Sequence, residues 1–408
     1  MKVENSISTG PRGHELRPML DLRDYENLNK VTGLERREDG IEVIWEKGGS
    51  SRFFYSWFRE NCASTKSRNV FTLERRVDPL DIPFDITPKD IELTDAGLLT
   101  FTWDDGHISR FPSGWLWYHS PDNDRNINPA YADHDPDWRL HQDAIIPRFT
   151  YNEYMKDDAQ FLRALDNLLD KGVILVDDVP CWEDAVVVLA NRISYLRETH
   201  YGPTFHVRYV PDPISGAFTN ERLISHTDLP NFENPPGIQF FHCIRNDAEG
   251  GETVLVDGFA VAQRLLETAP HHFDALVNNA LSFRLQDRNN DRHYRAPVIE
   301  LDYMGRLKQI RYSRTNLTPY VGSADTYKEV REAYLAFTKL VESPEFEMVF
   351  KLDPGELLIT ENTRMLHGRK GFDRASGDRH LQGCYIDRVD VVSRRDVTRR
   401  KLANDFKV

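Results

Sequence analysis

Short runs typical of β-strands fill the chain beyond residue 237, and they constrain the possible folds more than any other feature. The runs lie at 238–244, 252–256, 298–301, 309–312, 356–359 and 381–386. Patterns with helical apolar spacing precede or interrupt them, near 154–171, 183–198, 259–278 and 325–342. Strands separated in this way, with two helices leading, predict a jelly roll flanked by helices. We therefore expect a mainly β fold whose main domain is a double-stranded β-helix.

A smaller β-rich pattern precedes this domain. Alternating apolar and polar residues occur at 41–45, 51–55 and 99–103, and the last run is followed by the hairpin turn Asp104-Asp105-Gly106. A stretch rich in Asp, Asn and Pro then separates the two patterns. We expect four parts, namely a loose arm at 1–20, a small β-rich N-terminal domain at 21–118, a linker at 119–147 and the jelly-roll domain at 148–408.

The composition excludes several classes of partner. The net charge is −13 and the isoelectric point is about 5.6, whereas phosphate binding requires clustered Lys and Arg, so no nucleic acid is expected. No stretch approaches the roughly 20 apolar residues of a membrane span, and no apolar signal core begins the chain. The four cysteines are far apart and fit no disulfide framework. These features predict a cytoplasmic protein.

The motif His226-Thr227-Asp228 is the first candidate for chemistry. Residues i and i+2 at the end of a strand point to one face, so an imidazole and a carboxylate can reach the same point. Two His and one carboxylate on one face of the metal mark the non-haem iron oxygenases. The same His-x-Asp pattern begins at His141, in a polar connector, and at His272, in a helical pattern where the two side chains diverge.

Two residues near the C-terminus can complete such a site. His367 follows a strand and precedes a glycine, and it lies 139 residues after Asp228 (367 − 228). A distant third ligand fits a double-stranded β-helix, because the first and last strands of that fold are neighbours. Arg379 follows 12 residues later (379 − 367) at the start of another strand. Its planar guanidinium is suited to binding the distal carboxylate of 2-oxoglutarate.

A longer series of motifs resembles the γ-butyrobetaine dioxygenase and trimethyllysine dioxygenase family. The motifs are His226-Thr227-Asp228, Pro235-Pro236-Gly237-Ile238-Gln239, Gly250-Gly251-Glu252-Thr253, Leu366-His367-Gly368-Arg369 and Arg379-His380-Leu381. The resemblance covers about 150–395 and extends to the first domain through residues 57–62. It implies an Fe(II)- and 2-oxoglutarate-dependent hydroxylase that uses O2 and forms a homodimer. It further implies the iron ligands His226, Asp228 and His367, with Arg379 and Thr253 on 2-oxoglutarate.

The family's N-terminal domain carries a structural zinc held by three Cys and one His. Here Cys62 and His107 occupy two of these positions, whereas the other two are Ser64 and Ser67. Zinc is held by thiolate, imidazole or carboxylate rather than by a serine hydroxyl. We therefore predict that this zinc is absent.

The resemblance also identifies the residues around the substrate. The positions that enclose a quaternary ammonium are all aromatic, namely Tyr201, Phe205, Phe218 and Tyr385. Such rings attract a cation through their π faces. At the opposite, anionic end, two Asn of the butyrobetaine hydroxylases correspond to Ser215 and to the segment containing Arg314. We therefore expect hydroxylation of a small trimethylammonium zwitterion similar to γ-butyrobetaine.

Two alternatives remain open from the sequence. The substrate could be 2-(trimethylamino)ethylphosphonate or another biosynthetic intermediate, since an arginine at the anionic end also suits a more highly charged group. From a different class, the chain could be a non-catalytic jelly-roll binding protein that retains the fold.

Overall fold

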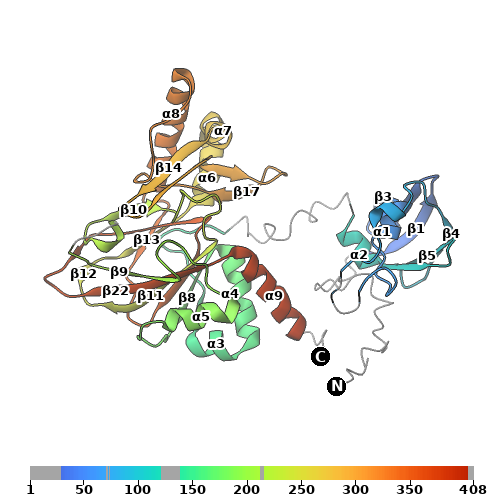
Figure 1. The fold of residues 1–408 in the computed structure, drawn as a ribbon, viewed down its shortest axis with the longest axis horizontal. Helices are drawn as coiled ribbons and strands as arrows, with labels where there is room; N and C mark the ends of the chain where they lie inside the picture. Colours follow the sequence, from blue (N-terminus) through green and yellow to red (C-terminus); the bar gives the residue numbers. More distant parts are fainter. Residues whose placement is uncertain (1–28, 70–71, 73, 121–137, 212–215, 403–408) are drawn as a thin grey trace. The chain divides into compact units, whose positions relative to one another are not determined.

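The computed structural model describes residues 29–69, 72, 74–120, 138–211 and 216–402 (Figure 1). The chain forms two compact units, Met1–Ala132 and Asp133–Val408. The arm expected at 1–20 lies outside the described residues. Part of the expected linker packs on the second unit, because Leu140 and Ile146 are buried in its interior.

The first unit contains two three-stranded antiparallel sheets. One sheet consists of β1 (Val31–Arg36), β2 (Gly40–Trp45) and β3 (Ser50–Phe54), and the other of β4 (Pro88–Leu93), β5 (Leu98–Trp103) and β6 (Ile108–Pro112). Two short helices, α1 (Tyr55–Glu60) and α2 (Ser113–Tyr118), and the 3-10 turn η1 (Pro79–Asp81) complete the unit.

Alternation along its strands builds an aromatic core. In β5 the buried side chains are Leu99, Phe101 and Trp103, and the residues between them are partly exposed. Phe58 of α1 packs on Phe101 with ring centroids 4.2 Å apart. Gly106 closes the β5–β6 hairpin with a φ of 76°, a left-handed conformation that a side chain would disfavour.

The second unit is organised around two facing sheets (Figure 1). The larger has the order β7-β8-β19-β11-β22-β9 and the smaller the order β10-β20-β13-β18. The strands of the larger sheet are β7 (Arg148–Thr150), β8 (Val173–Asp177), β19 (Leu357–Glu361), β11 (Ile238–Asn246), β22 (Arg379–Ile386) and β9 (Thr204–Arg208). The strands of the smaller sheet are β10 (Leu223–His226), β20 (Met365–Arg369), β13 (Thr253–Asp257) and β18 (Glu347–Phe350). This is the predicted jelly roll, and the prediction of a mainly β fold with flanking helices is confirmed.

Four helices cover the outer face of the larger sheet. They are α3 (Tyr151–Lys156), α4 (Asp158–Lys171), α5 (Ala185–Ile193) and α9 (Arg388–Leu402). Leu165 and Leu168 of α4 pack with Ile174 of β8 and Phe240 of β11 in one apolar cluster. Helix α4 ends at Gly172, whose φ of 75° is the left-handed C-cap that the sequence indicated.

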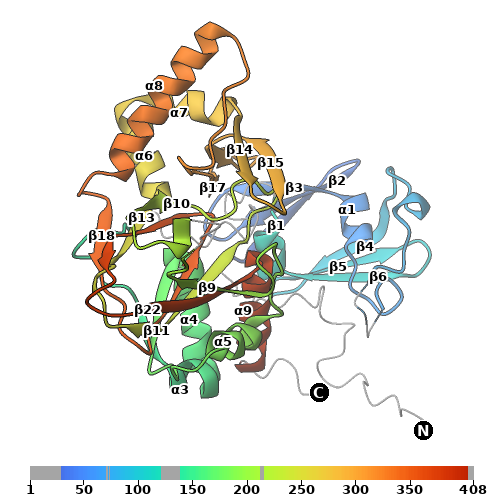
Figure 2. The ribbon, with the colours of Figure 1, turned by 60° about the vertical axis from the view of Figure 1, so that its left-hand side comes forward.

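A second group of elements is inserted between β13 and β18 (Figure 2). Its helices are α6 (Gly258–Thr268), α7 (Pro270–Asn278) and α8 (Ala324–Val341). Its strands form two pairs, β14 (Leu281–Gln286) with β15 (Asp291–Ala296), and β16 (Ile299–Leu301) with β17 (Leu307–Ile310). These elements share an apolar core of their own. A two-stranded ribbon pairs β12 (Glu249–Gly250), which follows β11, with β21 (Phe372–Asp373), which precedes β22. The 3-10 turn η3 (Gly216–Phe218) precedes β10.

Alternation assigns each side chain of β22 to one of two environments. Leu381 belongs to the cluster between the two sheets, together with Leu255 of β13 and Met365 of β20. Cys384 and Ile386 belong to the cluster under the helices. Arg379 and Tyr385 therefore point toward the interior of the jelly roll, as expected from the period of two along a strand. Among the described helices, none has the length and apolarity needed to span a bilayer.

Candidate active site

The two predicted imidazole ligands lie on neighbouring strands of the smaller sheet. His226 is the last residue of β10, and it is paired directly with His367 of β20. Their ring centroids are 4.5 Å apart. Strand pairing therefore brings together two residues that are 141 positions apart in the sequence (367 − 226).

Asp228 lies just beyond β10, and its carboxylate reaches both rings. Its Oδ1 is 3.2 Å from Nε2 of His226 and 3.6 Å from Nε2 of His367. One ligand-type atom from each of these three residues lies within 4.8 Å of the other two. The three side chains are largely buried, so this arrangement is a preformed cluster.

Asn362 fixes the backbone of Asp228 in this position. Its side-chain oxygen accepts a hydrogen bond from the Asp228 N–H at 2.7 Å, and its amide donates to the carbonyl oxygens of Asp228 and Pro236. The next residue, Leu229, has a left-handed φ of 53°. Such a conformation is unfavourable for a side chain with a Cβ and persists only where the surroundings enforce it.

Local contacts prepare the cluster to hold a divalent cation. The Ile224 carbonyl lies 2.8 Å from Nδ1 of His226, which assigns the proton to Nδ1 and leaves Nε2 free to coordinate. Burial lowers the pKa of His367, which favours the neutral ring that metals bind. Burial alone would raise the pKa of Asp228, but the neighbouring His367 and His226 hold it well below its usual range. Burial alone would lower the pKa of His226, but the hydrogen bond and the charge of Asp228 raise it, so a metal bound here displaces a proton from that ring. Two imidazoles and one carboxylate fit Fe(II).

The second oxygen of Asp228 is held by two further side chains. The Tyr385 hydroxyl donates to Oδ2 at 2.6 Å, and Nε2 of Gln239 also donates to it. Outer contacts of this kind orient a metal-binding carboxylate. Both residues lie on the larger sheet, at opposite positions of β11 and β22, so Asp228 joins the two sheets at the site.

Next to His367 is a small cavity with two arginines in its wall. Arg379, Arg369 and Thr253 line it together with apolar side chains. Nε of Arg379 donates to the Gly251 carbonyl at 3.3 Å, and its two terminal nitrogens have no hydrogen-bond partner among the described residues. Gly251 has a left-handed φ of 72°, and a Cβ there would lie 3.0 Å from Cδ of Arg379, so both backbone and space favour glycine beside this guanidinium. Burial and the charge of Arg369 lower the pKa of Arg379 to about 10, which still leaves it a cation at neutral pH.

Arg369 differs from Arg379 because both of its terminal nitrogens are already hydrogen-bonded. It donates to the carbonyl oxygens of Ala217, Thr219 and Glu221. These carbonyls belong to the loop that contains η3 and Phe218. Arg369 therefore holds one wall of the neighbouring substrate-sized cavity.

That larger cavity has a volume of about 350 Å³ and reaches all three residues of the metal cluster. The four predicted aromatic residues, Tyr201, Phe205, Phe218 and Tyr385, line it. The rings of Phe205 and Tyr385 are stacked, with centroids 4.9 Å apart. Gly383, which is opposite Phe205 on the adjacent strand, permits this stacking, because a Cβ there would lie 2.4 Å from Cζ of Phe205.

A polar wall lies elsewhere in the same cavity, formed by Asn231, Arg284, Gln286, Thr315 and Asn316. Arg284 forms a two-bond ion pair with Asp291 of the partner strand β15. Asn231 is only 3% exposed, yet neither its amide nitrogen nor its carbonyl oxygen has a hydrogen-bond partner among the described residues. A buried amide without partners is costly, so this side chain is suited to a polar group of a bound molecule.

The structure does not bring Arg314 to this cavity. Its guanidinium forms an ion pair with Glu342, directly after α8. The two following residues, Thr315 and Asn316, reach the cavity instead. Ser215, the other residue predicted for the anionic end, lies outside the described residues.

Four residues with structural roles at this site did not emerge from the sequence. Gln239 lies within a quoted motif, but a glutamine in a strand has no distinctive signature. Arg369 also lies within a motif given above, Leu366-His367-Gly368-Arg369, whereas Asn362 was indicated only as a polar residue after a buried strand. Asn231, three residues after Asp228, is a loop asparagine that only burial distinguishes.

In the first unit, the four positions assigned by resemblance to zinc do converge. Nε2 of His107 lies 3.1 Å from Sγ of Cys62 and 3.2 and 3.3 Å from the hydroxyl oxygens of Ser64 and Ser67. Burial alone would raise the pKa of Cys62, but hydrogen bonds, first that of His107, lower it to about 6. Two hydroxyls occupy the places where thiolates would be needed, and the absence of zinc stays a prediction.

Fold and site together define a jelly-roll dioxygenase that depends on Fe(II) and 2-oxoglutarate. Residues 133–385 match the model of the family described as taurine catabolism dioxygenase TauD, TfdA family, and residues 32–117 match gamma-butyrobetaine hydroxylase-like, N-terminal. The chain belongs to this TauD/TfdA family of dioxygenases. The predicted resemblance is confirmed.

Relatives match over most of the chain. It is 36% identical to gamma-butyrobetaine dioxygenase from Pseudomonas sp. (strain AK-1), across 94% of this chain and 100% of that protein. It is 34% identical to mitochondrial trimethyllysine dioxygenase from Rattus norvegicus, across 88% of this chain and 85% of that protein. Among solved structures, a putative taurine dioxygenase from Burkholderia xenovorans matches 61% of this chain and 90% of its own, with a TM-score of 0.47 and 16% identity.

Proposed function

We propose that this enzyme hydroxylates a small zwitterion with a trimethylammonium group at one end and a carboxylate at the other, as in γ-butyrobetaine. The observation that carries the proposal is a single cavity that combines four aromatic side chains, a polar wall and the cluster of His226, Asp228 and His367. The relatives named for γ-butyrobetaine and trimethyllysine support this substrate class.

The aromatic part of the cavity suits a quaternary ammonium. Such a cation has no N–H to donate, so ring faces rather than hydrogen-bond acceptors must attract it. Phe205, Phe218, Tyr201 and Tyr385 provide these faces, and each desolvated contact contributes about 0.5–2 kcal/mol. Because the Tyr385 hydroxyl is bonded to Asp228, the cation would be held close to the metal cluster.

The polar wall favours a carboxylate over a phosphonate. Asn231 offers an unpartnered amide, and Arg284 offers a charge that Asp291 already balances. Because Asp291 already balances Arg284, a singly charged carboxylate leaves one charge uncompensated there, whereas a doubly charged phosphonate would leave two. Asn231 and Arg284 thus replace Arg314 in our proposal for the anionic end.

The chain's own residues position the reaction. When bound, Fe(II) supplies the centre at which O2 and 2-oxoglutarate are converted to succinate and CO2, with oxidation of the substrate C–H bond. We propose that His226, Asp228 and His367 hold one side of the metal, and that Arg379 with Thr253 binds the distal carboxylate of 2-oxoglutarate. The cage and the polar wall fix which carbon faces the cluster, and correct orientation is a large part of the rate.

Succinate release provides the test. Purified enzyme with Fe(II) and 2-oxoglutarate is assayed with γ-butyrobetaine, with trimethyllysine, with 2-(trimethylamino)ethylphosphonate and with a neutral analogue in which carbon replaces the ammonium nitrogen. We expect iron-dependent succinate with the first compound and little with the neutral analogue. An absence of succinate with every quaternary amine would refute the substrate class while leaving the family assignment intact.

Substitution of the cage tests the cation more directly. Phe218→Leu keeps an apolar side chain but removes a ring face, so KM for the cationic substrate should rise by roughly 2–30-fold, the equivalent of one cation–π contact. Tyr195→Leu is the matched control, because Tyr195 is 74% exposed and does not line the cavity. Equal KM values for the two variants would contradict the cage.

A non-catalytic binding protein is the alternative from another class. The convergence of His226, the ionised Asp228 and the neutral His367 argues against it. Tight Fe(II) binding without any consumption of 2-oxoglutarate would favour that alternative. The predicted homodimer is a separate proposal, which sedimentation of the full chain would test.

A further inference from the structure

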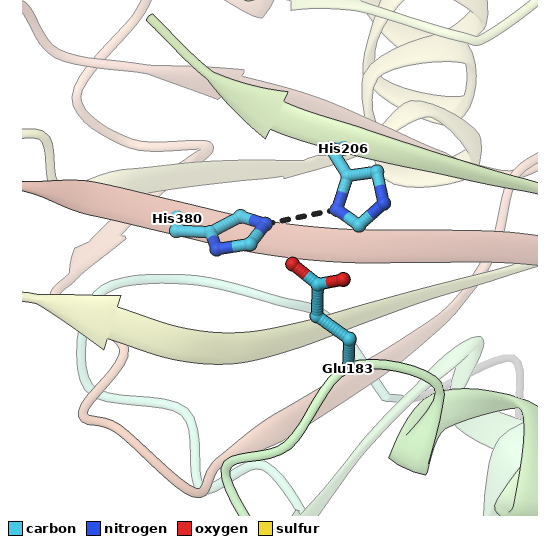
Figure 3. Close-up of side chains that lie close together, drawn as sticks. All are labelled: Glu183, His206 and His380. Atoms are coloured by element: carbon cyan, nitrogen blue, oxygen red, sulfur yellow. Dashed lines mark hydrogen bonds between the residues drawn. The ribbon is translucent and has the colours of Figure 1, made fainter.

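A second group of metal-binding side chains lies on the outer face of the larger sheet. It consists of Glu183, His206 and His380, and one ligand-type atom of each lies within 4.8 Å of the others. Figure 3 shows the two imidazoles meeting edge to edge, with the Glu183 carboxylate pointing toward the space between them. Nδ1 of His206 and Nε2 of His380 are 2.9 Å apart.

Adjacent strands hold the two imidazoles rigidly. In the β9–β22 pairing, His206 is opposite Gln382 and His380 is opposite Arg208. His380 and Gln382 are two residues apart on one strand, so His206 and His380 are diagonal neighbours on one face. Arg379 and Leu381 point to the other face, so this group is separate from the active site.

The loop that carries Glu183 is tied to the same strand. Gln382 accepts a hydrogen bond from the Asp184 N–H at 2.6 Å and donates to the Asp184 carboxylate at 2.8 Å. Asp184 has a left-handed φ of 69°, an unfavourable conformation that these bonds maintain. Gln382 therefore places Glu183 over the two imidazoles.

We propose that Glu183, His206 and His380 form a binding site for a divalent transition metal, with Zn²⁺ as the natural fit. Two imidazoles and a carboxylate are a zinc ligand set, and tetrahedral zinc separates two bound nitrogens by about 3.3 Å. The observed 2.9 Å requires a shift of a few tenths of an ångström. The metal replaces the proton that the two rings share.

The surroundings of the site allow a metal to enter. Glu183 is exposed, and both imidazoles are partly exposed. The Glu183 carboxylate makes no hydrogen bond or ion pair with the described residues, so it is available as a ligand. Burial, followed by the charges of His206 and Arg208, lowers the pKa of His380, and Glu183 opposes this. A bound cation would cross-link the loop before α5 to β9 and β22, the strands that carry Phe205 and Tyr385.

The experiment must prevent metal binding at the proposed iron site and at Cys62. The full-length, tag-free chain with His226→Ala, Asp228→Ala and Cys62→Ser is titrated with Co²⁺, a zinc substitute whose visible absorption reports low coordination number. We expect one Co²⁺ per chain in this parent. His206→Asn or His380→Asn should weaken binding by roughly 100-fold, and Glu183→Gln should weaken it by roughly 10-fold.

His293→Asn is the matched control, since His293 is an exposed histidine on β15 outside the group. It should leave binding unchanged. Thermal melting without metal checks that each variant is folded. If a histidine variant does not fold, Glu183→Gln still tests the site, because Glu183 is exposed. The proposal is overturned if the parent binds no Co²⁺, or if the Glu183 and histidine variants bind it as tightly as the parent. Because two of the three proposed iron ligands, His226 and Asp228, are replaced throughout, neither result depends on the proposed function.

Discussion

The Tyr385 hydroxyl lies 2.6 Å from Oδ2 of Asp228 and so joins the aromatic cage to the metal cluster. The ring of Tyr385 stacks on Phe205 in the cavity, while its hydroxyl donates to the carboxylate. One residue therefore contributes to two different functions, and substitution can separate them.

Tyr385→Phe should affect the metal more than the cation. The ring face remains, so KM for the substrate should change less than about threefold, whereas loss of the hydrogen bond to Asp228 should weaken Fe(II) binding by about 10-fold. Anaerobic Fe(II) titration and substrate kinetics measure the two effects. Tyr385→Leu, which also removes the ring, should raise KM as well, and identical behaviour of the two variants would contradict this division.

Asn362→Ala should loosen the turn that carries Asp228. The substitution removes three hydrogen bonds and leaves the Asp228 N–H without its partner. We expect the free energy of unfolding to fall by about 2–3 kcal/mol and Fe(II) affinity to fall about 10–100-fold. Urea unfolding and Fe(II) titration test this. Asn279→Ala, which removes one hydrogen bond at the end of α7, should lower stability less and leave iron affinity unchanged.

Arg379→Gln should weaken the binding of 2-oxoglutarate without affecting the binding of Fe(II). Loss of a charged partner for a carboxylate costs about 1.5–3 kcal/mol, so KM for 2-oxoglutarate should rise by roughly 10–150-fold. Fe(II) affinity should not change, because Arg379 forms no hydrogen bond or ion pair with His226, Asp228 or His367. Arg374→Gln, at an exposed arginine before β22, is the control. An unchanged KM for 2-oxoglutarate in Arg379→Gln would remove this residue from the proposed site.

His242 should make the fold sensitive to acid. Burial lowers the pKa of His242 to about 4, whereas in the unfolded chain it is about 6.5. As the pH falls below about 6.5 the unfolded chain takes up a proton first, so stability declines until about pH 4, by at most about 3 kcal/mol. Above pH 6.5 the residue has no such effect.

The comparison of His242→Leu with the parent isolates this contribution. Urea unfolding at pH 7 and pH 5 should show a loss of stability that is smaller in His242→Leu by about 2 kcal/mol. His141→Ala, at an exposed histidine, should retain the loss seen in the parent. If both variants lose as much stability as the parent, then another group is responsible.

The sequence predicted the sheets well because alternation and helix ends are local properties. Gly172 ends α4 as expected, and β5 alternates as expected. Helix α5, expected to reach about residue 198, ends at Ile193 instead. There Arg197 bonds to Asp387 and to the carbonyls of Asn234 and Pro235, and these distant partners hold the segment in an extended form.

The difference between local patterns and distant contacts also explains which site residues could be predicted. His226 and Asp228 could be found because two positions along a strand share a face, and this rule needs no tertiary information. Arg314 could not be placed, because its partner Glu342 lies beyond a whole helix. The group of Glu183, His206 and His380 depends on the order of strands in the sheet, which no local pattern reveals.

The most direct test of the account is succinate release coupled to γ-butyrobetaine, measured in the parent enzyme and in Asp228→Ala with Fe(II) present. We predict one succinate per hydroxylated substrate in the parent, and loss of both turnover and tight Fe(II) binding in the variant. Full turnover or unchanged iron affinity in Asp228→Ala would show that the cluster of His226, Asp228 and His367 does not hold the iron.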